Sequence, residues 1–167
     1  MRAVSKWCLS ITLAILAMAV VPMMAMAASY IDSLRGGEYY ATSTEGRFAG
    51  TATGALPGSW YIDVFHTPLS PNGTITGGAF SLGTVMNGQP TTITGSFAKG
   101  IVTQTSGSGC GNQTYALSGD LVSVGPYGSS HSGTGTFNGL LTHYRYSFYG
   151  SCITYGASVT GTVNLYF

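Results

Sequence analysis

The segment ASVTGTVNLYF, residues 157–167, alternates two kinds of side chain along its whole length. Successive side chains of a strand point to opposite faces, so the segment would have one apolar face and one polar face. The apolar face would carry Val159, Gly161, Val163, Leu165 and Phe167, and the polar face Ser158, Thr160, Thr162, Asn164 and Tyr166. This pattern predicts a strand that packs against a core on one side and meets water on the other.

Similar segments fill most of the chain upstream. The stretch SGTGTFNG, residues 132–139, leads into a strand with Phe137, Gly139 and Leu141 on one face, and its glycines indicate a curved sheet. Earlier segments of this kind are 47–53, 59–66, 74–85, 91–98, 101–106 and 113–124, with turns expected at sites such as Lys99-Gly100. Short, evenly spaced strands with Gly and Pro between them are typical of a barrel or a sandwich. We predict an all-β fold, a small antiparallel β-barrel of about eight strands.

The first 27 residues have the features of a secretory signal peptide. Arg2 and Lys6 precede an apolar stretch, and Ala25-Met26-Ala27 offers small residues for cleavage before Ala28. We therefore predict a signal peptide over 1–27, a lead-in segment over 28–44 that can hold a first strand, and one barrel domain over 45–167. The expected location is secreted, periplasmic or at the cell surface.

Charge excludes one class of partner. Without Arg2 and Lys6 the chain keeps four basic and five acidic residues, so its formal net charge changes from +1 to −1. Nucleic-acid binding needs a basic surface to hold phosphates, and four scattered basic residues do not provide one. We expect no nucleic-acid partner, and a soluble barrel is favoured over a membrane-bound one.

Two cysteines, Cys110 and Cys152, follow the predicted signal peptide. An even pair in an exported protein most simply forms one disulfide, and two unpaired thiols are the alternative. Neither the cysteines nor the histidines His66, His131 and His143 have the spacing of a metal site, and no GxSxG motif is present. We expect no metal, no cofactor and no hydrolase site.

A family resemblance adds to this pattern. The residues Leu117-Ser118-Gly119-Asp120-Leu121, Gly125 and 133–139 (GTGTFNG), followed by a long aromatic hairpin, resemble the C-terminal half of the dirigent and allene oxide cyclase barrels over about fifty residues. The resemblance implies an eight-stranded antiparallel barrel with a mostly apolar cavity that opens at one end, often in an oligomer. The acidic and basic site residues of that family lie outside the matching part, so no residue role is carried over.

One cluster of side chains has the composition of a binding site. His143, Arg145 and Tyr149 would share one face of a strand, and together with Trp60 and Asp63 they are our candidates for lining the barrel mouth. Such residues stack on and hydrogen-bond an aromatic or sugar-like ligand. The alternative is an ordinary half-buried strand whose polar face carries His and Arg.

These observations favour an exported barrel that binds a small hydrophobic or aromatic molecule without catalysis of its own. A cyclase or isomerase-type enzyme is the second hypothesis and depends on the resemblance alone. An eight-stranded outer-membrane barrel is the third, because the alternating segment ending at Phe167 is typical of the last strand of such proteins.

Overall fold

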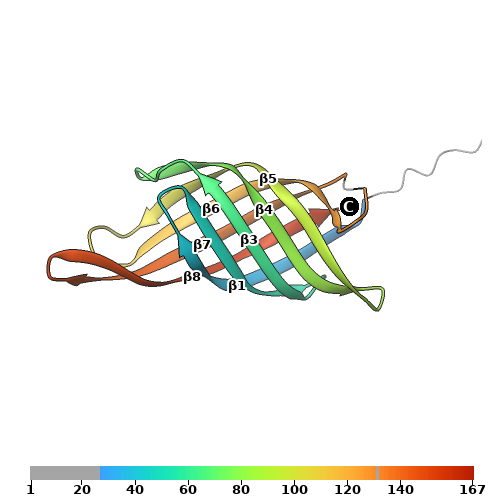
Figure 1. Ribbon diagram of the computed structural model, residues 1–167, viewed down its shortest axis with the longest axis horizontal. Helices are drawn as coiled ribbons and strands as arrows, with labels where there is room; N and C mark the ends of the chain where they lie inside the picture. Colours follow the sequence, from blue (N-terminus) through green and yellow to red (C-terminus); the bar gives the residue numbers. More distant parts are fainter. Residues whose placement is uncertain (1–26, 131) are drawn as a thin grey trace, which may run out of the picture.

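The computed structural model describes residues 27–130 and 132–167, which form a closed antiparallel barrel of eight strands (Figure 1). The predicted fold class is therefore confirmed. The strands are β1 (Ser29–Ala41), β2 (Glu45–Gly54), β3 (Gly58–His66), β4 (Asn72–Met86), β5 (Gln89–Ser106), β6 (Gln113–Pro126), β7 (Gly133–Phe148) and β8 (Ser151–Tyr166). The predicted signal peptide lies outside the described residues, apart from Ala27. Within the described ranges the structure contains no helix that is long and apolar enough to cross a membrane.

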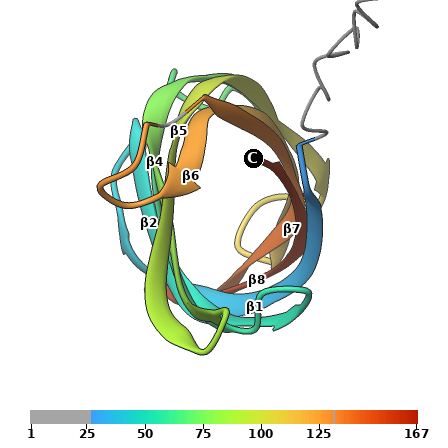
Figure 2. The ribbon, with the colours of Figure 1, turned by 90° about the vertical axis from the view of Figure 1, so that its right-hand side faces the viewer.

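The strands follow one another around the barrel in sequence order, and β1 closes the ring by pairing with β8 (Figure 2). That last pairing joins Ser29–Gly36 to Val159–Tyr166. The segment expected as a lead-in thus contains a complete barrel strand. The weak alternation of apolar and polar residues in Ser29–Ala41 hid this strand, because Asp32, Gly36 and Glu38 occupy three of its inward positions.

The up-and-down order creates two different ends. The terminal end holds both chain termini and the β2–β3, β4–β5 and β6–β7 turns. The disulfide end holds the β1–β2, β3–β4, β5–β6 and β7–β8 turns. It is named for the bond between Cys110, in the β5–β6 loop, and Cys152 in β8, which confirms the predicted pairing. A disulfide is also what an oxidising compartment outside the cytosol would allow.

The barrel is apolar inside, and its outer face mixes polar side chains with exposed apolar ones. In β8, Val159, Val163 and Leu165 are buried in the core, whereas Thr160 and Thr162 are exposed. A transmembrane barrel has the opposite arrangement, with apolar side chains facing lipid and a polar interior. The structure therefore gives no support to the outer-membrane hypothesis.

The turn expected at Lys99-Gly100 is wrong, since β5 runs through both residues. The ladder between β5 and β6 shifts register between Phe97 and Lys99, which is a bulge rather than a turn. A side chain at Gly100 would collide with the backbone oxygen of Ser118 and lie 2.8 Å from the Cα of Gly119. Glycine stands here because two backbones approach closely. The segments 91–98 and 101–106 are accordingly one strand.

A side chain from the β2–β3 turn closes the terminal end. Leu56 is buried, and its backbone N–H donates a 2.8 Å hydrogen bond to Oδ1 of Asp32, which is itself fully buried. The Oδ2 atom of Asp32 has no hydrogen-bond partner within the described part of the chain. The rings of Tyr30 and Phe167 stack nearby, with centroids 4.8 Å apart. Asp32 thus holds the turn that carries Leu56 into the core.

Two variants of Asp32 separate this hydrogen bond from the charge. Asp32→Asn keeps an oxygen to accept from Leu56, whereas Asp32→Ala leaves the buried N–H without a partner. An unsatisfied buried donor costs about 1–3 kcal/mol. We expect the Ala variant to have a free energy of unfolding lower than that of the Asn variant by this amount, measured by urea denaturation. Equal stabilities would show that the bond to Leu56 does not hold the turn.

Candidate functional site

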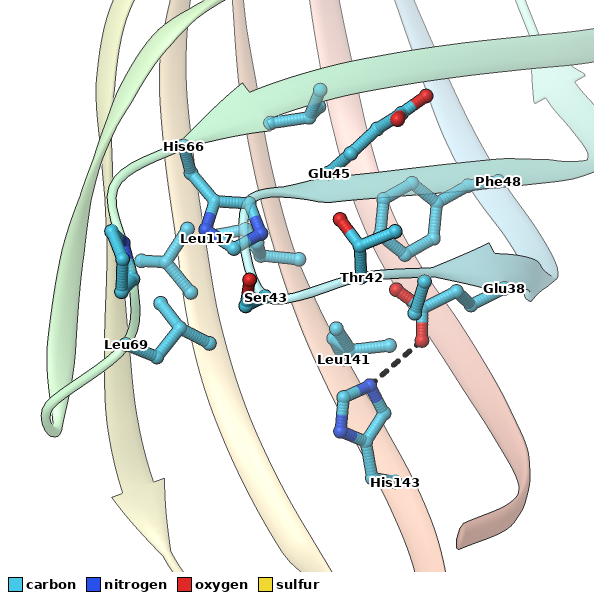
Figure 3. A pocket seen from close by; sticks show the side chains of 14 residues that line it. Glu38, Thr42, Ser43, Glu45, Phe48, His66, Leu69, Leu117, Leu141 and His143 are labelled. Atoms are coloured by element: carbon cyan, nitrogen blue, oxygen red, sulfur yellow. Dashed lines mark hydrogen bonds and ion pairs between the residues drawn. The ribbon is translucent and has the colours of Figure 1, made fainter.

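A cavity of about 210 Å³ opens at the disulfide end of the barrel (Figure 3). Its floor is apolar and its rim carries polar side chains. The lining comes from six strands, the β1–β2 turn and the β3–β4 loop, and comprises Glu38, Ala41, Thr42, Ser43, Glu45, Phe48, Val64, His66, Pro68, Leu69, Val102, Leu117, Leu141 and His143. At the terminal end the side chain of Leu56 is buried and the rings of Tyr30 and Phe167 stack on each other.

The floor follows from strand alternation. Phe48, Val64, Val102, Leu117 and Leu141 are inward residues of β2, β3, β5, β6 and β7, and all five are buried. Deeper in the barrel, a void between Phe48, Trp60 and Phe137 measures only about 10 Å³. A molecule that enters the cavity therefore rests on this apolar layer and goes no further.

A hydrogen-bonded pair, Glu38 and His143, lies on one side of the cavity. Glu38 is in β1 and His143 in β7, and the two side chains meet with 2.8 Å between Oε2 and Nε2 (Figure 3). Their side chains are only 9% and 18% exposed. Because Nε2–H donates to the carboxylate, the neutral imidazole presents Nδ1 as an acceptor. The pair brings a carboxylate and a ring nitrogen to an otherwise apolar wall.

The opposite side of the rim is formed by loops. The Nδ1 atom of His66 lies 2.8 Å from the carbonyl oxygen of Thr67, so that nitrogen carries the proton and Nε2 is the acceptor in the neutral ring. The hydroxyl groups of Thr42 and Ser43 come from the β1–β2 turn. Leu69 projects from the β3–β4 loop toward the cavity (Figure 3). The rim therefore offers hydrogen-bond acceptors on two sides of an apolar floor.

Comparisons with known proteins add no assignment to this geometry. No protein-family model matches the chain, and searches of curated proteins and of solved structures found no match either. In the part of the chain that the structure describes, no group of three or more His, Cys, Asp or Glu side chains could hold a metal ion. The function has to be argued from the cavity itself.

Trp60 and Asp63, two of the five candidate residues, lie away from the cavity. Trp60 is 2% exposed in the core, where its indole N–H donates to the carbonyl oxygens of Arg35 and Thr51. Asp63 lies on the outer face of β3, 3.9 Å from Arg47. Burial raises the pKa of the Asp63 carboxyl, the neighbouring Glu45 raises it further, and Arg47 opposes the rise. Because successive side chains of a strand point to opposite faces, Trp60 and Asp63 of β3 cannot both line the barrel mouth.

The other three candidates all come from β7 and the turn that follows it, but they have different surroundings. His143 lines the cavity. Arg145 holds the β5–β6 loop, because its backbone N–H donates to Oδ1 of Asn112 and its Nη1 donates to the carbonyl oxygen of Gly109. Tyr149 is 94% exposed at the tip of the β7–β8 hairpin. His143 is thus the one candidate of the five that contributes to this cavity.

Sequence reasoning missed Glu38, the partner of His143. The two residues are 105 positions apart, so no local spacing connects them. Glu38 also lies in the segment that was expected as a lead-in. The sequence nevertheless indicates Glu38 in two ways. It is one of only five acidic residues in the chain, and in a strand whose inward face carries Asp32 and Leu34 it would also face inward.

Proposed function

We propose that the protein is a binding module for a small ring-shaped apolar molecule that carries a hydrogen-bond donor, and that the site is the cavity at the disulfide end. The observation that carries the proposal is the juxtaposition of the apolar floor with the Glu38–His143 pair. Ligand sites commonly combine an apolar lining with a few fixed polar groups in this way. The barrel mouth is also a usual place for such a site.

The size of the cavity limits the ligand. An apolar cavity of roughly 150 Å³ holds benzene, so a cavity of about 210 Å³ accommodates one six-membered ring with a short substituent. Drug-sized ligands occupy roughly 300–1,000 Å³, which excludes most of them without rearrangement of the rim. The ligand class is therefore a monocyclic compound.

The polar groups of the rim limit the substituent. The carboxylate of Glu38 accepts hydrogen bonds, and each of the rings of His143 and His66, in its neutral form, has one acceptor nitrogen. A hydroxyl or amino group on the ligand would satisfy one of these acceptors. A ligand without a donor would leave them unpaired in a poorly hydrated site, which costs binding free energy.

The proposal agrees with what the dirigent and allene oxide cyclase resemblance implies, an apolar cavity that opens at one end. It assigns no reaction to the Glu38–His143 pair, since a hydrogen-bonded pair beside an apolar wall is equally suited to orient a ligand. Fold-level similarity does not decide between binding and isomerisation. We therefore propose binding without catalysis.

Phenol and toluene test this proposal as a matched pair of probes. We expect phenol to shift the backbone amide resonances of cavity residues in a ¹⁵N–¹H NMR titration, and toluene to bind at least fivefold more weakly because it lacks a donor. Leu69→Trp places an indole in the cavity and should weaken phenol binding at least tenfold. Val85→Trp adds the same group at an exposed position of β4 and should leave phenol binding unchanged.

Two results would contradict the proposal. One is a wild-type protein whose cavity resonances do not respond to phenol at saturating concentration. The other is phenol binding that survives Leu69→Trp, which would place the site elsewhere. Phenol and toluene binding equally well would retain the cavity as the site but overturn the role of Glu38, His143 and His66.

A further inference from the structure

The β7–β8 hairpin extends beyond the rest of the barrel at the disulfide end (Figure 1). The ladder between β6 and β7 reaches only His143, and the ladder between β1 and β8 ends at the Gly36–Val159 pair. Beyond these points β7 and β8 pair with each other as far as Phe148 and Ser151. The outer part of the hairpin is therefore a two-stranded ribbon outside the closed sheet.

The β5–β6 loop contacts one edge of this ribbon and is bonded through Cys110 to the side chain of Cys152 in β8, whereas the backbone of the other edge has no strand partner in the described ranges. On the β7 side, Arg145 bonds to Asn112 and Gly109 of the β5–β6 loop. On the β8 side, residues 151–156 have no ladder partner other than β7 anywhere in the described ranges. An exposed strand edge pairs readily with another strand unless charged residues, proline or a very short length prevents it. The sequence SCITYG of this edge contains neither a charge nor a proline.

The outer face of the ribbon is aromatic. Its rings form a continuous series of contacts in which Tyr144 touches Tyr155, Tyr155 touches Tyr146, Tyr146 touches Phe148, and Phe148 touches Tyr149. Four of them are well exposed, namely Tyr146 (44%), Phe148 (51%), Tyr149 (94%) and Tyr155 (66%). Exposed apolar surface that is this contiguous usually marks an interaction site.

We propose that the ribbon binds a second copy of this chain, with the free edges of the two β8 strands pairing antiparallel around a twofold axis. A free edge requires a partner that offers a free edge of its own, and this chain carries one. An antiparallel twofold pairing brings the same edge of each copy together, so the interface is self-complementary. It also places the two aromatic faces side by side in one continuous sheet.

The exposed rings set an upper limit on the apolar area of this interface. With about 200 Å² for a fully exposed aromatic side chain, the four rings leave on the order of 500 Å² accessible in each copy. Edge pairing buries only the part of this area that faces the other copy, together with the paired backbones, so the interface belongs to the small class below about 1,200 Å². No charged side chain lies in residues 146–156, so two copies meet without repulsion between like charges.

Tyr155→Lys tests the proposal, because a lysine on a free edge opposes strand pairing. We expect the wild-type chain, without residues 1–27, to sediment as a dimer at micromolar concentration. Tyr155→Lys should weaken dimerisation at least tenfold. Tyr127→Lys places the same charge at an 80% exposed tyrosine in the β6–β7 turn of the terminal end and should leave the dimer intact. Near-ultraviolet circular dichroism verifies that each variant is folded.

Hydrogen exchange locates the interface independently of the variants. Amides in residues 151–156 should gain protection as the protein concentration rises through the dimerisation range, whereas exposed turns at the terminal end should not. A chain that stays monomeric at several hundred micromolar overturns the proposal. So does a dimer that Tyr155→Lys leaves unchanged, or binding of the monomer through the ribbon to phosphatidylcholine vesicles instead of to another copy. None of these measurements depends on phenol binding in the cavity. A failure of the dimer proposal therefore says nothing about the proposed function, and the reverse also holds.

Discussion

Replacing Trp60 by alanine is expected to lower the free energy of unfolding by about 3–5 kcal/mol, which is the usual cost of truncating a large buried aromatic side chain. The indole is 2% exposed and lies against Phe48, Ile62, Val159 and other core residues around the small central void. Gly36 leaves room for the indole, because a side chain at that position would lie 2.7 Å from its Cζ2 atom. No small shift of the sheet can fill the space that the indole leaves.

The variant Trp60→Phe separates packing from hydrogen bonding. It retains a ring but removes the N–H that donates to the carbonyl oxygens of Arg35, at 3.3 Å, and Thr51, at 3.0 Å. We expect it to cost about 1–3 kcal/mol, less than Trp60→Ala. Tyr61→Ala is the matched control, because Tyr61 is the next residue of β3 and is 37% exposed on the outer face.

Urea denaturation followed by far-ultraviolet circular dichroism measures these differences. Fluorescence is unsuitable, because Trp60 is the only tryptophan after residue 27. Tyr61→Ala is expected to cost under about 1 kcal/mol, in the range of other surface substitutions. A loss for Trp60→Ala no larger than that for Tyr61→Ala would contradict the placement of Trp60 at the centre of the core.

The sequence was most informative where side chains alternate strictly. In β8 the residues expected to face inward include Val159, Val163 and Leu165, and all three are buried. The alternation predicted strands less well where two backbones approach so closely that only glycine fits in the strand. Gly100 resembles a turn residue in sequence, yet it allows close contact with β6. Gly36 interrupts the apolar pattern of β1 because the backbone oxygen of Ala49 and the indole of Trp60 occupy the space that a side chain would need.

The cavity was less predictable than the barrel. Its floor consists of inward strand residues, so an apolar interior followed from the pattern. Its rim depends on how the β1–β2 turn and the β3–β4 loop fold over the mouth, and turn conformation is not encoded by period-two alternation. The contact between Glu38 and His143 also needs the closure of β1 on β8, which brings β1 and β7 to either side of one strand. The closure depends on all eight strands together, so no local sequence pattern predicts it.

Removing the disulfide is the second change with a large expected effect. The bond joins residues 42 positions apart, with Cα atoms 4.9 Å apart, and the loop that it closes contains all of β6 and β7. Cross-linking a loop of this length removes conformations from the unfolded chain and contributes about 4 kcal/mol in the chain-entropy model. We expect the double variant Cys110→Ser, Cys152→Ser to unfold with a free energy lower by this amount.

The reduced wild-type protein supplies the control for this measurement. Treatment with dithiothreitol should lower the stability of the wild type to that of the double variant, and it should leave the double variant unchanged. The loss should come from the unfolded state, because the barrel ladders and the contacts of Arg145 with the β5–β6 loop do not include the sulfur atoms. Circular dichroism of the folded double variant should therefore match that of the wild type. A double variant whose spectrum shows less strand structure in the absence of denaturant would mean instead that the disulfide holds the folded ribbon in place. A decrease in the free energy of unfolding of less than about 1 kcal/mol would contradict the entropic account.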